Sequence, residues 1–158
     1  MNTAATARAG SRAGALRDLE AEVGVLIRRV RRVIGERARA VHPELLPASY
    51  LMLSHVRDHG PLRASALACA FDIDKGATSR QVQHLLDLGL LDREPDPEDG
   101  RATLLSASAD AVRRLERVAE SRRRELDDAL GDWSADELCR FARNMRRYND
   151  ALSIPADR

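Results

Sequence analysis

The sequence predicts a mainly α fold, in which short central helices and a β-hairpin are flanked by long helices. Two observations lead to this fold class. Leucine, valine and alanine dominate the apolar residues and aromatic residues make up only 3%, a composition whose core suits helices. Apolar positions also recur at the spacing of a helix face over most of the 158 residues, a length that most simply forms one domain.

The first long helix is predicted to follow residues 1–14, which lack apolar periodicity and which we expect to form a flexible tail. From Leu16 to Ile34 the apolar residues lie on one helix face, and the helix ends before Pro43. A helix of about 25 residues spans roughly 37 Å, which is more than a small core requires. A helix of this length usually reaches a partner.

Two short helices and a short extended segment come next. Residues 47–59 form the first helix, which Gly60-Pro61 stops. Leu62-Arg63 can form one extended piece. Ser65 is then a candidate N-cap for a second helix over residues 66–71.

The following helix is unusual in its charge. It starts after Asp74, a good N-cap, and reaches Leu88 before Gly89. No acidic residue lies from position 75 to position 86, although residues 60–108 carry five basic and eight acidic groups, a net charge of −3. The helix is expected to turn Thr78, Val82, Leu85 and part of Gln81 inward, and to present Gly76, Ser79, Arg80, Gln83 and His84 on the opposite face.

A hairpin is predicted from strands over residues 90–94 and 102–106, with Asp99-Gly100 as the turn signal. Its acidic residues do not have the ligand spacing of a calcium loop, because prolines interrupt them and the twelfth residue from Asp96 is Ala107.

Two long helices complete the order of elements. Ser108 caps the first of them, and the capping box Ser134-x-x-Glu137 opens the second. Three compact helices followed by a hairpin form a winged helix-turn-helix. It spans residues 47–107, between long helices over residues 15–46 and 108–158.

Residues 77–101 resemble the recognition helix and wing of the MarR (multiple antibiotic resistance regulator) family of bacterial transcription factors. The similar features are the Ser79-Arg80 pair, a Leu-x-x-x-Gly-Leu segment over residues 85–90, an arginine at Arg93, and an Asp-Pro-x-Asp-x-Arg wing over residues 96–101. The chain departs from the pattern at Gly100, where the family commonly has arginine.

The resemblance implies a homodimeric regulator that binds a pseudo-palindromic operator in double-stranded DNA, with residues 15–46 and 108–158 as dimerisation helices. It also implies repression relieved by a small-molecule effector, and it requires no cofactor. The chain has no recognisable catalytic motif, so we do not expect an enzyme. No segment is apolar enough to cross a membrane or to serve as a signal peptide, so we expect a cytoplasmic protein.

Eight residues are candidates for DNA contact, because they lie on the acid-free helix or on the hairpin that follows it. Arginine can bind guanine through two hydrogen bonds, glutamine can pair with adenine, and an arginine on a wing can enter the minor groove. The alternative for the helix face is plain solvation, and for the wing arginine an ion pair with Glu98 or Asp99. The resemblance implies that Asp99 holds the guanidinium of Arg101 in position. The candidates are Lys75, Gly76, Ser79, Arg80, Gln83, His84, Arg93 and Arg101.

Other residues leave alternatives open. Tyr50 resembles residues that line the family's effector pocket, although packing in the core would explain it equally well. His55 is a second candidate for this pocket. His55 and His59 have the i, i+4 spacing of a metal pair but no evident third ligand. Cys69 and Cys139 are expected to be buried structural thiols, with redox sensing as the alternative.

The negative charge of residues 60–108 motivates a second functional class. A winged helix can serve as a protein-interaction module that does not bind DNA. Steep salt dependence of DNA binding would distinguish the two functions.

Overall fold

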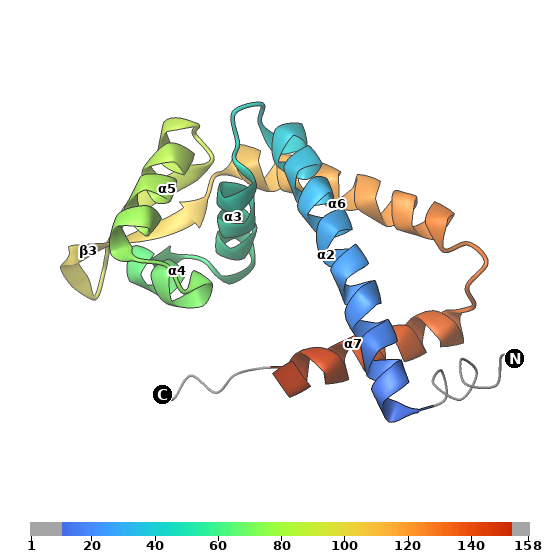
Figure 1. Cartoon of the computed structure of the whole chain (residues 1–158). Helices are drawn as coiled ribbons and strands as arrows, with labels where there is room; N and C mark the ends of the chain where they lie inside the picture. The colour runs from blue at the N-terminus through green and yellow to red at the C-terminus, as the bar shows by residue number, and fades with distance from the viewer. Residues whose placement is uncertain (1–10, 153–158) are drawn as a thin grey trace, which may run out of the picture. The chain divides into compact units, whose positions relative to one another are not determined.

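The computed structural model describes residues 11–152 and confirms a mainly helical fold with one small sheet (Figure 1). The chain divides into two compact units between Val118 and Ala119. Among the residues described, no helix has the length and apolarity needed to cross a membrane. In chain order the elements are α2 (Arg12–Val41), α3 (Pro47–His59), β1 (Leu62–Arg63), α4 (Ala64–Phe71), α5 (Lys75–Asp87), β2 (Leu91–Asp96), β3 (Asp99–Ala107), α6 (Ala109–Ala129) and α7 (Ala135–Leu152).

Helix α2 begins at Arg12, inside the segment that the sequence assigned to a tail. Ser11 is its N-cap, and the Ser11 hydroxyl accepts a hydrogen bond from the N–H of Gly14 at 3.1 Å. Apolar periodicity starts only at Leu16, so the pattern missed the first turn, which the cap stabilises. The rest of the predicted tail, residues 1–10, lies outside the described residues.

Helix α3 has the predicted bounds, whereas α4 starts two residues earlier than predicted. The chain passes directly from β1 into α4, so Ser65 lies within the first turn and is not the cap. Gly60 follows α3, where a Cβ atom would stand 2.5 Å from the carbonyl oxygen of Val56. Only glycine fits this close approach.

The sheet has the order β1-β3-β2, and both strand pairs are antiparallel. The predicted turn at Asp99-Gly100 is wrong, because the turn lies at Pro97-Glu98. The Asp96 carboxylate accepts a hydrogen bond from the N–H of Glu98 at 2.9 Å, and proline suits the first corner of such a turn. These two local preferences outweigh the Asp-Gly signal.

The turn is followed by an irregularity in the strand pairing. Pro95 pairs with Thr103, but the next residue, Asp96, pairs with Asp99. Residues 100–102 are therefore extra residues on β3 and form a bulge. A bulge re-aims the side chains that it carries, and Arg101 lies at its centre.

The core of the first unit lies between α3, α5, the hairpin and the first turns of α6. The inward face predicted for α5 is confirmed. Ala111 and Leu115 of α6 are buried here, so the first unit extends beyond the predicted boundary at residue 107. The largest fully buried side chains are Met52, Leu53, Leu67, Leu85, Leu90, Leu105, Leu115, Val41, Val56, Thr78 and Ser49.

Ser108 joins three elements at the base of the hairpin. Its N–H donates to the carbonyl oxygen of Leu90 at 3.1 Å, and its hydroxyl donates to that of Gly89 at 2.9 Å. The same hydroxyl accepts the N–H of Ala111 at 3.2 Å, which confirms the predicted cap of α6. Gly89 has a φ of +66°, a conformation that glycine adopts without strain.

The second unit contains the predicted capping box. The Glu137 carboxylate accepts the N–H of Ser134 at 2.8 Å, and the Ser134 hydroxyl accepts the N–H of Glu137 at 3.3 Å. The rings of Trp133 and Phe141 meet edge to face, with centroids 5.6 Å apart. No residue of α7 is buried.

Both cysteines are exposed, so the expectation of buried thiols is wrong. Cys139 lies on α7, and Cys69 lies on the outer side of the short helix α4. Helix α4 is apolar nearly all round, so periodicity did not show which of its sides faces the core. Cys139 lies on an amphipathic helix of which no residue is buried in this chain.

Leu53→Ala tests the position of the core. Leu53 is fully buried, so we expect its truncation to lower the free energy of unfolding by about 2–5 kcal/mol. Leu51→Ala is the matched control on the same helix, because Leu51 is 40% exposed and should lose less than about 1 kcal/mol. Denaturant titration at one fixed protein concentration measures both. Equal losses of unfolding free energy in the two variants would contradict this position of the core.

Candidate nucleic-acid interface

Helix α5 owes its start to Asp74. The Asp74 carboxylate accepts the N–H of Ala77 at 2.8 Å, and this hydrogen bond holds the pKa of the carboxyl below its usual value. A Cβ atom on Gly76 would stand 3.0 Å from the same carboxylate oxygen. A side chain at position 76 would therefore crowd the cap that starts the helix.

The acid-free face of α5 is open to solvent over most of its length. Five of the six candidates on this helix are exposed, namely Lys75, Gly76, Ser79, Arg80 and Gln83. His84 is the exception, because it is half-buried and its Nε2 lies 3.1 Å from the carbonyl oxygen of Glu44. The imidazole thus links α5 to the segment between α2 and α3. The sequence pattern had placed it on the free face.

Gln83 also has a partner within the chain. Its Nε2 donates to the carboxylate of Asp87 at 2.7 Å, one helical turn further along. Both groups are exposed, and a hydrogen bond between exposed groups contributes little net free energy. The amide can therefore exchange this partner for a base edge.

Two hollows lie beside α5. One has a volume of about 240 Å³ and lies between α4, α5 and the hairpin, where it brings together Lys75, Ser79 and Arg93. The other is lined by Arg80 and His84 together with Leu46, Ser49, Ala77 and Gln81. Five of the eight candidates therefore fall into two groups, one at each hollow.

The hairpin tip projects from the three short helices (Figure 1). Arg101 is exposed at this tip, and its backbone N–H donates to the Asp99 carboxylate at 3.1 Å. The expectation that Asp99 holds the guanidinium of Arg101 is corrected by this geometry, since Asp99 holds the backbone instead. Within residues 11–152, no ion pair joins Arg101 to Glu98 or Asp99.

Arg63 is the residue that pairs with the wing carboxylates. Its Nε donates to Asp96 at 2.7 Å, and its Nη1 lies 3.6 Å from Asp99. The N–H of Glu98 and then the Arg63 guanidinium hold the pKa of Asp96 below its usual value. The Asp96 side chain is only 7% exposed, so this is the most enclosed ion pair of the described chain.

Sequence reasoning missed Arg63 and Asp96. The two residues lie 33 positions apart, and no local pattern reports such a pairing. A signal was nevertheless present, because a lone arginine in a predicted strand preceded a hairpin rich in acids. The observed register pairs Arg63 with Leu104 of β3, which brings the arginine to the hairpin.

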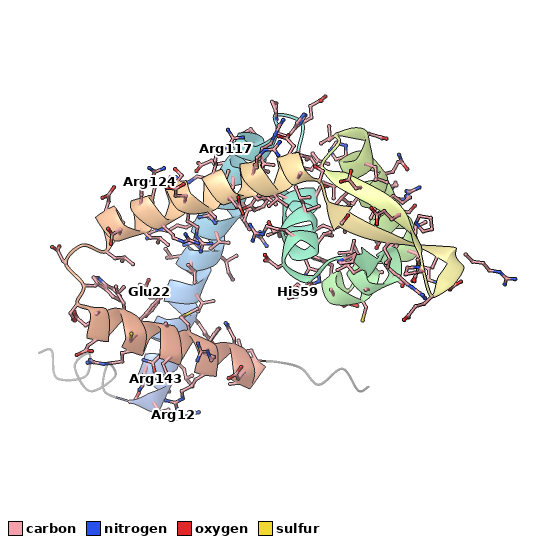
Figure 2. All side chains as sticks on the ribbon, turned by 180° about the vertical axis from the view of Figure 1, so that it is seen from behind. Arg12, Glu22, His59, Arg117, Arg124 and Arg143 are labelled. Atoms are coloured by element: carbon pink, nitrogen blue, oxygen red, sulfur yellow. The ribbon has the colours of Figure 1, made fainter. Side chains whose placement is uncertain are left out.

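The candidates for the effector pocket lie on α3. Tyr50 and His55 are both half-buried, and Tyr50 packs against the core. The ring of His55 lies 4.4 Å from that of His59, which ends α3 (Figure 2), and 5.5 Å from that of Phe71. Across the described residues, no group of three or more His, Cys, Asp or Glu side chains is arranged to hold a metal ion.

Comparison with known proteins gives one consistent result. A model of the MarR family matches residues 44–102. YxaD of Bacillus subtilis (strain 168), an uncharacterised HTH-type transcriptional regulator, is 30% identical over 134 residues, which cover 85% of this chain and 92% of YxaD. The HTH-type transcriptional repressor NicR of Pseudomonas putida is 24% identical and covers 85% of this chain and 86% of NicR. The crystal structure of RV1404 from Mycobacterium tuberculosis has the same fold, with a TM-score of 0.73, 21% identity, and coverage of 87% of this chain and 94% of that one.

Asp96→Asn tests the electrostatics of the wing. A carboxyl whose pKa is lower in the folded than in the unfolded state stabilises the fold above about pH 4, and this contribution is lost as the pH falls through the folded pKa. We therefore expect the free energy of unfolding to fall less between pH 6 and pH 3 in Asp96→Asn than in the wild type. Asp92→Asn, an exposed carboxylate on the same strand, is the control. Identical pH profiles for Asp96→Asn and the wild type would contradict the assignment.

Proposed function

This chain belongs to the MarR family of transcription regulators, and from that premise we propose a homodimeric repressor that a small ligand releases from its operator. The family membership makes the chain a DNA-binding transcription regulator and not an enzyme. The proposal adds the residues that contact DNA, the dimer interface and the site of the effector.

The observation that carries the proposal is the exposed, acid-free face of α5 beside a projecting hairpin. An α-helix fits the major groove of B-DNA, and base edges there present a distinct pattern of donors and acceptors. Arg80 and Gln83 have the side chains that read guanine and adenine, and both are exposed in mid-helix. We assign base contacts to these two residues.

Backbone contacts are assigned to the residues around the first hollow. Lys75, Ser79 and Arg93 line it together, and cationic or hydroxyl side chains are the usual partners of phosphate oxygens. Such contacts set the position of a protein on DNA without reading its sequence. Arg101, at the hairpin tip, is assigned to the minor groove, whose negative potential attracts arginine.

The proposed dimer uses apolar side chains that each unit exposes. Helices α2 and α7 both carry a row of large hydrophobic residues open to solvent, a pattern that marks interaction surfaces. In a two-fold dimer the same surface serves both copies, and the two recognition helices would read half-sites about one DNA turn apart. The residues are Leu16, Leu19, Leu26, Ile27 and Val30 of α2, and Leu138, Phe141 and Leu152 of α7.

The proposed effector binds near Tyr50 and His55 and favours the state that does not bind DNA. A ligand regulates only through its difference in affinity for the two states, and a tenfold change in DNA affinity requires about 1.4 kcal/mol. The direction of regulation is supported by NicR, which is a repressor. A regulator of this kind acts where the DNA is, which favours a cytoplasmic location.

Arg101→Ala and Gln83→Ala separate the two kinds of DNA contact. We expect Arg101→Ala to weaken binding about tenfold on many sequences, because the wing contact depends little on the base. Gln83→Ala should instead lose about 1–3 kcal/mol of discrimination at particular base pairs. Fluorescence anisotropy with a panel of duplexes, each titrated at several salt concentrations, measures both effects.

The wing assignment is wrong if Arg101→Ala leaves both the affinity and the salt slope intact. Each phosphate that the protein neutralises contributes about 0.9 log unit of affinity per log unit of salt. A wild-type protein with no salt-dependent affinity for any duplex would favour the protein-interaction module instead.

Phe141→Glu tests the dimer. Phe141 is 52% exposed in one chain and its ring contacts that of Trp133, so a carboxylate there removes this one contact and otherwise acts on an interface. We expect light scattering at micromolar concentration to give a dimer mass for the wild type and a lower mass for the variant. Arg143→Glu, two residues further along on the polar side of α7, should remain dimeric. A monomeric wild type would contradict the dimer.

A further inference from the structure

We propose that Arg63 is a positioning residue for DNA binding, which fixes the turn of the wing and thereby aims Arg101 at the DNA. The proposal rests on the proposed function. It assigns a role to a residue outside both the recognition helix and the hairpin.

One guanidinium spans the turn. The Nε of Arg63 lies 2.7 Å from the Oδ2 of Asp96 and its Nη2 lies 2.5 Å from the same oxygen, while Nη1 lies 3.6 Å from the Oδ2 of Asp99. Asp96 ends β2 and Asp99 begins β3, and the two residues are paired across the turn. Arg63 therefore connects the two residues that close the turn.

Each carboxylate uses its second oxygen on the backbone of the turn. The Oδ1 of Asp96 accepts the N–H of Glu98 at 2.9 Å, and the Oδ1 of Asp99 accepts the N–H of Arg101 at 3.1 Å. A continuous path thus runs from the guanidinium of Arg63 through Asp99 to the backbone of Arg101. Loss of Arg63 would free Asp99 and, with it, the bulge that carries Arg101.

The charge of the turn points the same way. Like charges placed directly opposite each other on paired strands destabilise a hairpin, and Asp96 faces Asp99 in this manner. Arg63 supplies the cation between them. Without it, the uncompensated carboxylates would repel each other and loosen the turn that carries Arg101.

The geometry of the turn favours arginine over lysine at this position. Its planar fork presents several donors in fixed directions, whereas lysine offers a single point charge on a flexible chain. The two-residue strand β1 anchors the backbone of Arg63 against β3, so the fork enters the turn from a fixed position.

A direct phosphate contact is the competing role, since the Arg63 side chain is 43% exposed. The two roles differ in their dependence on Arg101. A residue that acts through Arg101 has no effect once Arg101 is gone, whereas an independent phosphate contact is lost additively.

The experiment is a double-mutant cycle on the full chain. The probe is a duplex that the wild-type protein selects from a randomised pool. Anisotropy gives its affinity for wild type, Arg63→Gln, Arg63→Lys, Arg101→Ala and the double variant Arg63→Gln/Arg101→Ala. Arg57→Gln is the matched control, because Arg57 forms a comparable ion pair with Asp58 on α3, at 2.8 Å. Thermal melting checks that every variant is folded.

We expect Arg63→Gln to weaken binding about tenfold, Arg63→Lys about threefold, and Arg57→Gln less than twofold. In the Arg101→Ala background, Arg63→Gln should add less than a twofold loss. Additive losses would overturn the positioning role and assign Arg63 to a phosphate. An Arg63→Gln protein that binds like the wild type would overturn the proposal altogether.

Amide hydrogen exchange without DNA separates this proposal from the proposed function. The N–H groups of Glu98 and Arg101 should exchange at least about tenfold faster in Arg63→Gln and at the wild-type rate in Arg57→Gln. Unchanged exchange overturns the positioning role even when DNA binds. If the wild type selects no duplex, the proposed function fails, and the role of Arg63 in DNA binding fails with it, whatever the exchange rates.

Discussion

The proposed DNA-binding lobe depends on the hydrogen bonds that meet at Ser108. One residue holds the carbonyl groups of Gly89 and Leu90 and also caps α6. The end of the recognition helix, the base of the wing and the start of the helix that leaves the lobe are thereby fixed to one another. The proposed recognition helix and wing are thus tied together at their bases, and neither base can move without breaking these bonds.

On this lobe the positions of the charged groups matter more than the net charge. Residues 60–108 carry a net −3, yet four of their eight acids are engaged locally: Asp74 caps α5, Asp96 and Asp99 bind Arg63 and the turn, and Asp87 accepts from Gln83. A carboxylate held by a cation or by backbone N–H groups projects less negative potential outward. The basic residues that have no such partner are left to determine how the lobe meets a polyanion.

Much of the fold could be predicted from sequence because its signals are local. The cap at Asp74, the stop at Gly89 and the box at Ser134 each involve residues within a few positions, and all three are present. The hairpin was also predicted, but its turn was misplaced, because two local signals competed within four residues. The pairing of Arg63 with Asp96 and the link from His84 to Glu44 join residues 33 and 40 positions apart, and no periodicity encodes them. The prediction that both cysteines are buried was wrong for a related reason. An apolar pattern shows that a residue can be buried, but it does not show which neighbour would cover it.

The position of Trp133 determines what the fluorescence of the protein can report. It is the only tryptophan in the chain, it lies between α6 and α7 against the edge of Phe141, and it is 41% exposed. The tryptophan fluorescence of the protein therefore originates in the second unit, and the proposed DNA-binding lobe contributes none of it. Trp133 is thus a fluorescent probe on the unit that holds none of the proposed DNA contacts. A change in its emission during a DNA titration would show, without any added dye, that DNA binding affects the second unit as well.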